Sequence, residues 1–121
     1  MKKDNVIVDK SKAFALRIIK LYKYLCDEKK EYILSKQLIR CGTSIGANVK
    51  EAIRGQSNAD FKAKMNIALK EASETEYWLE LLHESDYLTN EQFESISADC
   101  IELLKILTAI LNSSRKENNA Q

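Results

Sequence analysis

The sequence contains no proline and only three glycines among 121 residues. Antiparallel β sandwiches and barrels need many tight turns, and glycine and proline usually build those turns. A turn-rich β architecture is therefore excluded. Apolar residues make up 45% of the chain and charged residues 31%, which is typical of a helical bundle. Because 121 residues suit one domain and suffice to bury a core, we expect a single all-α domain over residues 1–121.

Histidine occurs once, and the three cysteines lie far apart. Cys26, Cys41 and Cys100 form no C-x-x-C pair, so we expect buried thiols in a reducing compartment and no zinc site. His83 follows Glu80 with the E-x-x-H spacing of ferritin-like bundles, but a di-metal site needs two such motifs. No residue pattern supports an acyl-transfer triad. The sequence predicts no enzyme, no catalytic residue, no metal and no cofactor.

Long hydrophobic runs are also missing. No apolar stretch approaches the roughly 20 residues that a membrane span needs. The first ten residues, "MKKDNVIVDK", hold a three-residue apolar run, far short of the core of a signal peptide. We expect a cytoplasmic protein with no membrane partner.

Apolar residues recur at steps of three and four through most of the chain, which predicts four amphipathic helices. The expected ranges are 10–28, 36–54, 58–85 and 90–114, joined by short polar connections. Short connections between long helices favour antiparallel neighbours. The predicted architecture is an antiparallel, up-and-down four-helix bundle.

Polar residues at the predicted helix ends fit capping patterns. Thr89 with Gln92 has the form of a capping box, in which each side chain bonds the other residue's backbone. Gly55 stands just past the second helix, where a left-handed C-cap suits glycine. The expected N-caps are Asp9 or Ser11, Ser35, Ser57 (with Asp60) and Thr89.

Two of the three glycines interrupt the second helix in "CGTSIGANVKEA", residues 41–52. Each mid-helix glycine costs about 1 kcal/mol relative to alanine. A ligand-binding loop would avoid that cost, but the apolar stripe keeps its helical phase and no phosphate-loop motif is present. We therefore predict a helix in which Gly42, Gly46 and the adjacent Ala47 permit close packing, within the bundle or between subunits. A ligand groove is the alternative.

Three polar residues of the same helix, Ser44, Asn48 and Glu51, share one face. We expect them to form a buried polar network that fixes the helix register. A solvated seam at a subunit contact and a ligand site are the alternatives.

Charge is divided unequally along the chain. Residues 1–64 carry a net charge of +8 and residues 65–121 carry −7. Such a split indicates an electrostatic partner for the basic half. That partner is either nucleic acid or the acidic half, which the basic half would meet within the same bundle or in a second copy. Overall neutrality is unusual for a dedicated RNA-binding protein. The candidate phosphate contacts are Arg17, Lys20, Lys23, Arg40, Lys50 and Arg54.

Two aromatic residues lie on the third helix in "ETEYWLELL". If Leu79 and Leu82 face the core, Trp78 is rotated by about 100° from Leu79 onto the flank of the bundle. Tyr77 and Trp78 are therefore candidate anchors of a subunit interface. A position at the edge of the core is the alternative for Trp78.

The stretches "LSKQLIRCGTSIGANVKEA" and "ADFKAKMNIALKEASETEYWLELL" resemble the four-helix proteins known as 23S rRNA intervening-sequence proteins. The likeness spans about residues 10–112, and Ser44, Asn48 and Glu51 match as well as the apolar positions. Many members have proline where this chain has Gly46. The matching positions are Gln37, Leu38, Arg40, Ser44, Ile45, Ala47, Asn48 and Glu51.

The resemblance implies a bacterial, non-enzymatic protein that forms a pentameric ring of bundles. Accessory proteins of diversity-generating retroelements resemble such rings and bind nucleic acid. The resulting hypothesis is a homo-oligomer that binds RNA or a nucleoprotein through the first two helices, with no small-molecule substrate. The alternative is a protein–protein interaction module that makes no contact with nucleic acid.

Overall fold

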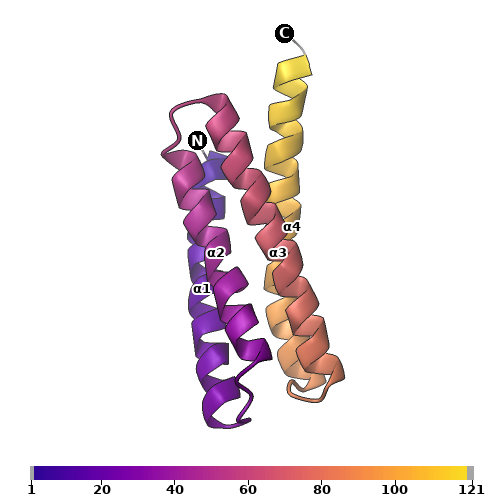
Figure 1. The fold of residues 1–121 in the computed structure, drawn as a ribbon. Coiled ribbons are helices and arrows are strands. Elements are labelled where there is room, and N and C mark those ends of the chain that lie inside the picture. Colours follow the sequence, from indigo (N-terminus) through magenta and orange to yellow (C-terminus); the bar gives the residue numbers. More distant parts are fainter. Residues whose placement is uncertain (1, 120–121) are drawn as a thin grey trace.

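The computed structural model describes the backbone of residues 2–119 and the side chains of residues 6–113. The described chain forms four α-helices, α1 (Lys2–Asp27), α2 (Leu34–Ile53), α3 (Asn58–Glu84) and α4 (Asn90–Asn119). The helices run alternately up and down, so that α2 lies between α1 and α3 while α4 lies beside α3 (Figure 1). This arrangement confirms the predicted all-α four-helix bundle.

The first helix starts earlier than the sequence pattern predicts. It begins at Lys2 rather than near residue 10, so Asp9 and Ser11 lie inside it and neither is its N-cap. Ile7 is fully buried and extends the apolar stripe of Phe14 by two turns. The burial of Ile7 explains why the helix includes the short apolar run of residues 6–8.

The start of α2 is held by a carboxylate from the preceding connection, not by Ser35. Glu31 accepts hydrogen bonds from the backbone N–H groups of Ile33 (3.1 Å), Leu34 (3.0 Å) and Ser35 (2.7 Å). The Ser35 hydroxyl instead donates back to the Glu31 carbonyl at 2.8 Å. Burial alone would raise the pKa of Glu31, but these backbone hydrogen bonds outweigh it and hold the pKa below its usual value. A glutamate therefore performs the capping that we expected from Ser35.

The starts of α3 and α4 follow the predicted patterns. The Ser57 hydroxyl accepts from the Asp60 N–H at 3.1 Å. The Thr89 N–H donates to the Gln92 side chain at 2.9 Å, and the Gln92 N–H donates to the Thr89 hydroxyl at 3.1 Å. These contacts confirm the capping residues at both helix starts. Gly55, in contrast, has no positive φ, so the expected left-handed C-cap is wrong.

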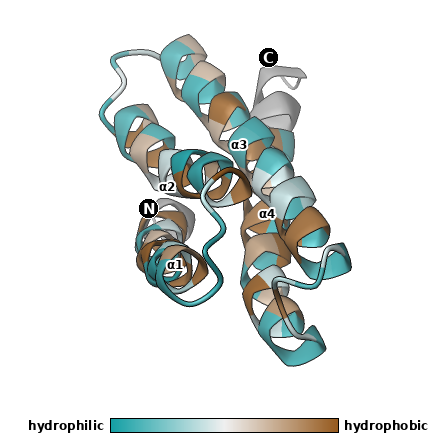
Figure 2. Cartoon of the chain, turned by 60° about the horizontal axis from the view of Figure 1, so that its bottom comes forward, coloured by the Kyte–Doolittle hydropathy of each residue, from teal (hydrophilic) through white to brown (hydrophobic). Residues whose placement is uncertain are grey.

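The core runs along the centre of the bundle, where the apolar stripes of all four helices meet. Brown, apolar segments extend along every helix, while teal residues dominate the connections (Figure 2). The contact between α2 and α3 is the most extensive, and the contact between α1 and α4 is the least. The bundle is therefore tight between successive helices and loose where its first and last helices meet.

Candidate functional site

The glycines of α2 lie directly against α1. A Cβ at Gly42 would stand 2.9 Å from both Cγ atoms of Ile18, and one at Gly46 would stand 3.5 Å from the backbone of Ser11. The helix runs unbroken through both positions. The small-residue face therefore makes a helix–helix contact inside the bundle. Ala47 is exposed and takes no part in that contact.

The expected side-chain network of Ser44, Asn48 and Glu51 does not form. The Ser44 hydroxyl donates to the Arg40 carbonyl (2.6 Å), and the Asn48 amide donates to the Ser44 carbonyl (2.9 Å). Glu51 is exposed and pairs with Lys64 of α3 at 3.3 Å. A backbone carbonyl one turn earlier is the nearest acceptor for a short polar side chain in a helix, so Ser44 and Asn48 bond locally, whereas Glu51 pairs with the neighbouring helix.

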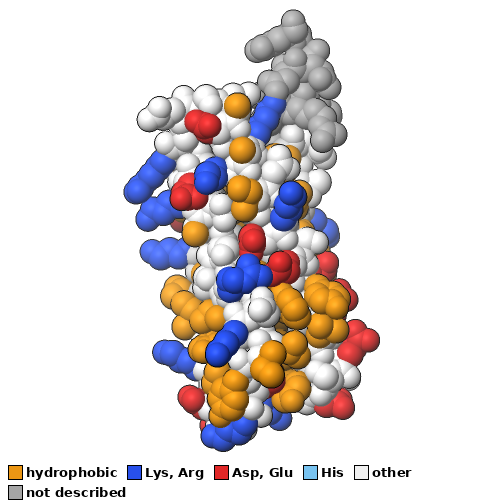
Figure 3. Space-filling view, in the orientation of Figure 1, with side chains coloured by type: hydrophobic (Ala, Val, Ile, Leu, Met, Phe, Trp, Pro, Cys, Tyr) orange, Lys and Arg blue, Asp and Glu red, His pale blue; other side chains and the backbone are white. Residues whose placement is uncertain are grey.

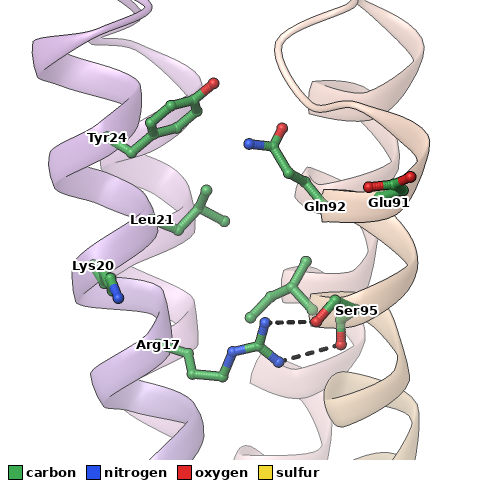
Figure 4. Close-up of a pocket in the computed structure, with 8 residues that line it drawn as sticks. Arg17, Lys20, Leu21, Tyr24, Glu91, Gln92 and Ser95 are labelled. Atoms are coloured by element: carbon green, nitrogen blue, oxygen red, sulfur yellow. Dashed lines mark hydrogen bonds between the residues drawn. The ribbon is translucent and has the colours of Figure 1, made fainter.

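Two of the candidate phosphate-binding arginines are engaged within the chain. Arg17 donates to Asp99 (2.6 Å), to the Ser95 carbonyl (3.2 Å) and to the Ser95 hydroxyl (2.9 Å), and the two bonds to Ser95 are drawn in Figure 4. Arg40 pairs with Glu71 (3.5 Å) and with Glu74 on α3. These contacts tie α1 to α4 and α2 to α3. Each guanidinium therefore already has a carboxylate partner within its own chain.

The other candidate cations remain available. Lys20, Lys23, Lys50 and Arg54 are exposed and make no ion pair with the described residues. Lys and Arg side chains line the edge formed by α1 and α2, whereas acidic side chains gather low on the opposite edge (Figure 3). The charge split seen in the sequence is thus a split between two sides of the molecule.

A cleft of about 550 Å³ opens where α1 and α4 separate. Leu21 and Tyr24 of α1 point across it toward Gln92 of α4, and Arg17 bridges to Ser95 beneath them (Figure 4). The remaining lining residues are Lys20, Glu91 and Ile96. The cleft is amphipathic and holds no histidine or cysteine that would act as a nucleophile or base.

Of the two candidate interface aromatics, Tyr77 is the exposed one. Its side chain is 53% exposed and meets the Trp78 ring edge-on, with the ring centroids 5.3 Å apart. Trp78 packs against the core and donates from Nε1 to Glu74 at 3.2 Å. Trp78 therefore lies at the edge of the core, and Tyr77 is the aromatic that a partner would meet. Ile33 is also exposed, at 78%.

The remaining candidate reactive groups have structural partners. The His83 ring stacks on Phe93 with a centroid distance of 4.2 Å, and its Nε2 lies 2.6 Å from the Asn90 side-chain oxygen. Burial raises the pKa of Cys41 to about 11 and that of Cys100 to about 12, so both thiols stay protonated near neutral pH. Among residues 6–113 no cluster of three metal-binding side chains occurs.

Two features were not predicted from the sequence. The α1–α4 cleft depends on how far two helices stand apart, and no local pattern encodes that distance. The second feature is the exposure of Leu16, at 61%. The sequence did contain a signal for it, because Leu16 lies two residues from both Phe14 and Ile18 and so falls outside the apolar stripe.

No helix of the described chain is long and apolar enough to cross a membrane.

Comparison with known proteins places the chain in a family. The profile of the family 23S rRNA-intervening sequence protein matches residues 3–109. A solved structure from Bacteroides thetaiotaomicron, a protein of unknown function from the S23 ribosomal protein family, is 59% identical to this chain. It superposes with a TM-score of 0.90, and the match covers 91% of this chain and 98% of the other. No curated protein matches. The chain therefore belongs to the 23S rRNA-intervening sequence protein family.

Proposed function

We propose that this protein acts without catalysis, as a cytoplasmic homo-oligomer that binds RNA through the outward cations of α1 and α2. The observation that carries the proposal is a set of exposed cations, on α1 and α2 or directly after α2, that make no ion pair with residues 6–113: Lys20, Lys23, Lys50 and Arg54. The name of the family links it to 23S rRNA, so structured rRNA is the RNA to test. The resemblance described above favours five copies in the assembly.

Contacts from these side chains would be to phosphates and would carry little sequence information. Each phosphate contact releases counterions. For every such contact, the logarithm of the binding constant falls by about 0.7–0.9 when the salt concentration rises tenfold. Four contacts per chain therefore predict a slope of about −3.

The test is a salt series with a structured fragment of 23S rRNA and the purified protein. The double variant Lys50→Glu/Arg54→Glu should weaken binding and reduce the salt slope by about 2. Lys70→Glu is the matched control, because Lys70 is an exposed lysine of the acidic helix α3 that makes no ion pair with the described side chains. Equal weakening by the control, or no binding of the wild type at low salt, would contradict the proposal.

A second candidate is a protein–protein interaction module without nucleic acid. Two observations favour it: Arg17 and Arg40 are engaged by carboxylates of the same chain, and the apolar side chains of Ile33 and Tyr77 are exposed. This function would be identified if the wild-type protein self-associates but binds no RNA even at low salt.

A further inference from the structure

The cleft between α1 and α4 carries an aromatic ring next to two cations of the proposed RNA surface. Lys20 lines the cleft and is one of those cations, and Lys23 follows it within one helical turn. Tyr24, one turn after Lys20, is half-buried and points across the cleft (Figure 4). RNA phosphates bound by the two lysines would therefore run along the mouth of the cleft.

The two walls of the cleft differ in charge. The α1 wall carries Lys20 and the α4 wall carries Glu91, and neither side chain makes an ion pair with the described residues. Arg17, at the base of the cleft, is already paired with Asp99. Because the carboxylate of Glu91 repels phosphates, an RNA backbone stays on the α1 side. The part of a nucleotide that suits the space between the walls is its uncharged base.

Gln92 offers a hydrogen-bond donor inside the cleft. Its side-chain oxygen accepts from the Thr89 N–H at 2.9 Å, and this bond fixes which end of the amide faces the backbone. Its amide nitrogen makes no hydrogen bond with the described residues and points toward α1 (Figure 4). An unpaired base presents acceptor atoms at its edges, so this amide can hold a base without selecting one of the four.

The remaining lining of the cleft is apolar and large enough for a ring. Leu21 and Ile96 supply apolar surface beside Tyr24. The volume of about 550 Å³ lies within the roughly 300–1,000 Å³ of small-molecule sites. A base inside a duplex has its faces covered and its pairing edge occupied, so only an unpaired base can stack on a protein ring.

We propose that the α1–α4 cleft takes one unpaired base of the bound RNA, stacked on Tyr24 and hydrogen-bonded by the amide nitrogen of Gln92. The proposal rests on the RNA binding in the proposed function and specifies the class of RNA. The preferred ligand is a stem with an unpaired nucleotide, not an uninterrupted duplex. Because stacking on an aromatic ring tolerates every base, the preference is for an unpaired position and not for a sequence.

The test compares two RNA hairpins that differ by one base. One carries a single unpaired nucleotide, with each of the four bases in turn, and the other carries an abasic nucleotide at the same position. Both have the same number of phosphates, so the ratio of their binding constants isolates the contribution of the base. The wild type should bind the hairpin with the base about 5–150 times more tightly.

Two variants and one control assign that ratio to the cleft. Tyr24→Leu should bring the ratio close to one without changing the salt slope, whereas Tyr24→Phe should retain it. Gln92→Glu keeps the oxygen that caps α4 but removes the amide donor, so it should lower the ratio. Tyr32→Leu is the matched control, because Tyr32 is a 50% exposed tyrosine of the basic half that lies outside the cleft. It should keep the ratio of the wild type.

The outcomes separate this proposal from the proposed function. If the wild type binds both hairpins equally, with the expected salt slope, the cleft takes no base although RNA binding stands. If it binds neither hairpin at low salt, both proposals fail. A Tyr24→Leu variant that keeps the ratio, or a Tyr32→Leu variant that loses it, overturns the assignment to the cleft. A changed particle mass of Tyr24→Leu in light scattering would show that a second copy fills the cleft instead. Far-UV circular dichroism confirms that each variant is folded.

Discussion

The two glycines of α2 should respond in opposite directions to the same substitution. Alanine is favoured over glycine inside a helix by about 0.8–1.0 kcal/mol. At Gly46 a new Cβ would meet Ser11 at 3.4–3.5 Å, an ordinary van der Waals separation. Gly46→Ala should therefore raise the free energy of unfolding by up to about 1 kcal/mol.

At Gly42 the same methyl group would stand 2.9 Å from both Cγ atoms of Ile18 and 3.3 Å from its Cβ. Ile18 is fully buried and branched at Cβ, so it has little freedom to move aside. Overpacking of this kind costs about 1–3 kcal/mol. After the gain in helix propensity is subtracted, Gly42→Ala should lower the free energy of unfolding by about 1 kcal/mol.

Urea unfolding at one fixed protein concentration measures both effects, since oligomerisation would otherwise shift the midpoint. In an Ile18→Ala background the clash is removed, so Gly42→Ala should become stabilising there, with a coupling energy of about 2 kcal/mol. If Gly42→Ala stabilises the protein as much as Gly46→Ala, the close approach of α1 and α2 does not constrain this position and the reasoning fails.

Three further predictions concern capping and thiol chemistry. Glu31→Gln should lower the free energy of unfolding by about 1–2 kcal/mol at neutral pH, because a charged acceptor of three N–H groups is lost. The pKa of Glu31 is lower in the folded protein than its ordinary value of 4.5. The difference in unfolding free energy between wild type and Glu31→Gln should therefore be complete above pH 4.5 and disappear as the pH falls through the folded pKa. Urea midpoints measured at a series of acid pH values would show this. Thr89→Ala should lower the free energy of unfolding by about 1 kcal/mol in the same assay. An unchanged urea midpoint would show that the capping box does not stabilise the protein. A thiol reagent applied to native protein should modify the half-buried Cys26 well before Cys41 and Cys100, and equal rates would show that burial does not protect the latter two.

The sequence predicted features that depend on local spacing. The apolar period of α2 through Gly42 and Gly46 and the capping boxes at Ser57 and Thr89 are set by residues a few positions apart. The start of α1 was missed because residues 2–5 are polar, and its continuation depends on burial of Ile7 against other helices. Local patterns therefore located the helices but not every helix end.

Contacts between helices were predicted less well. The cap from Glu31 depends on the path of a connection, and the pairing of Arg17 with Asp99 depends on the relative height of α1 and α4. The sequence allowed the basic half to pair with the acidic half inside the bundle, but it did not show which carboxylates meet which arginines. The network expected from Ser44 and Asn48 failed because a helical backbone offers nearer acceptors.

The loose contact between α1 and α4 has a consequence for local opening. The side chains that bridge these helices, Arg17 to Asp99 and Lys10 to Glu102, are exposed, and such pairs contribute about 0–1 kcal/mol and weaken in salt. The contact between α2 and α3 also has exposed ion pairs, but there and between the other successive helices the main contact is apolar packing, which salt does not screen. Local opening should therefore begin with the separation of α1 from α4. Backbone amide protons around Gln92 should then exchange with solvent before those around Ile45.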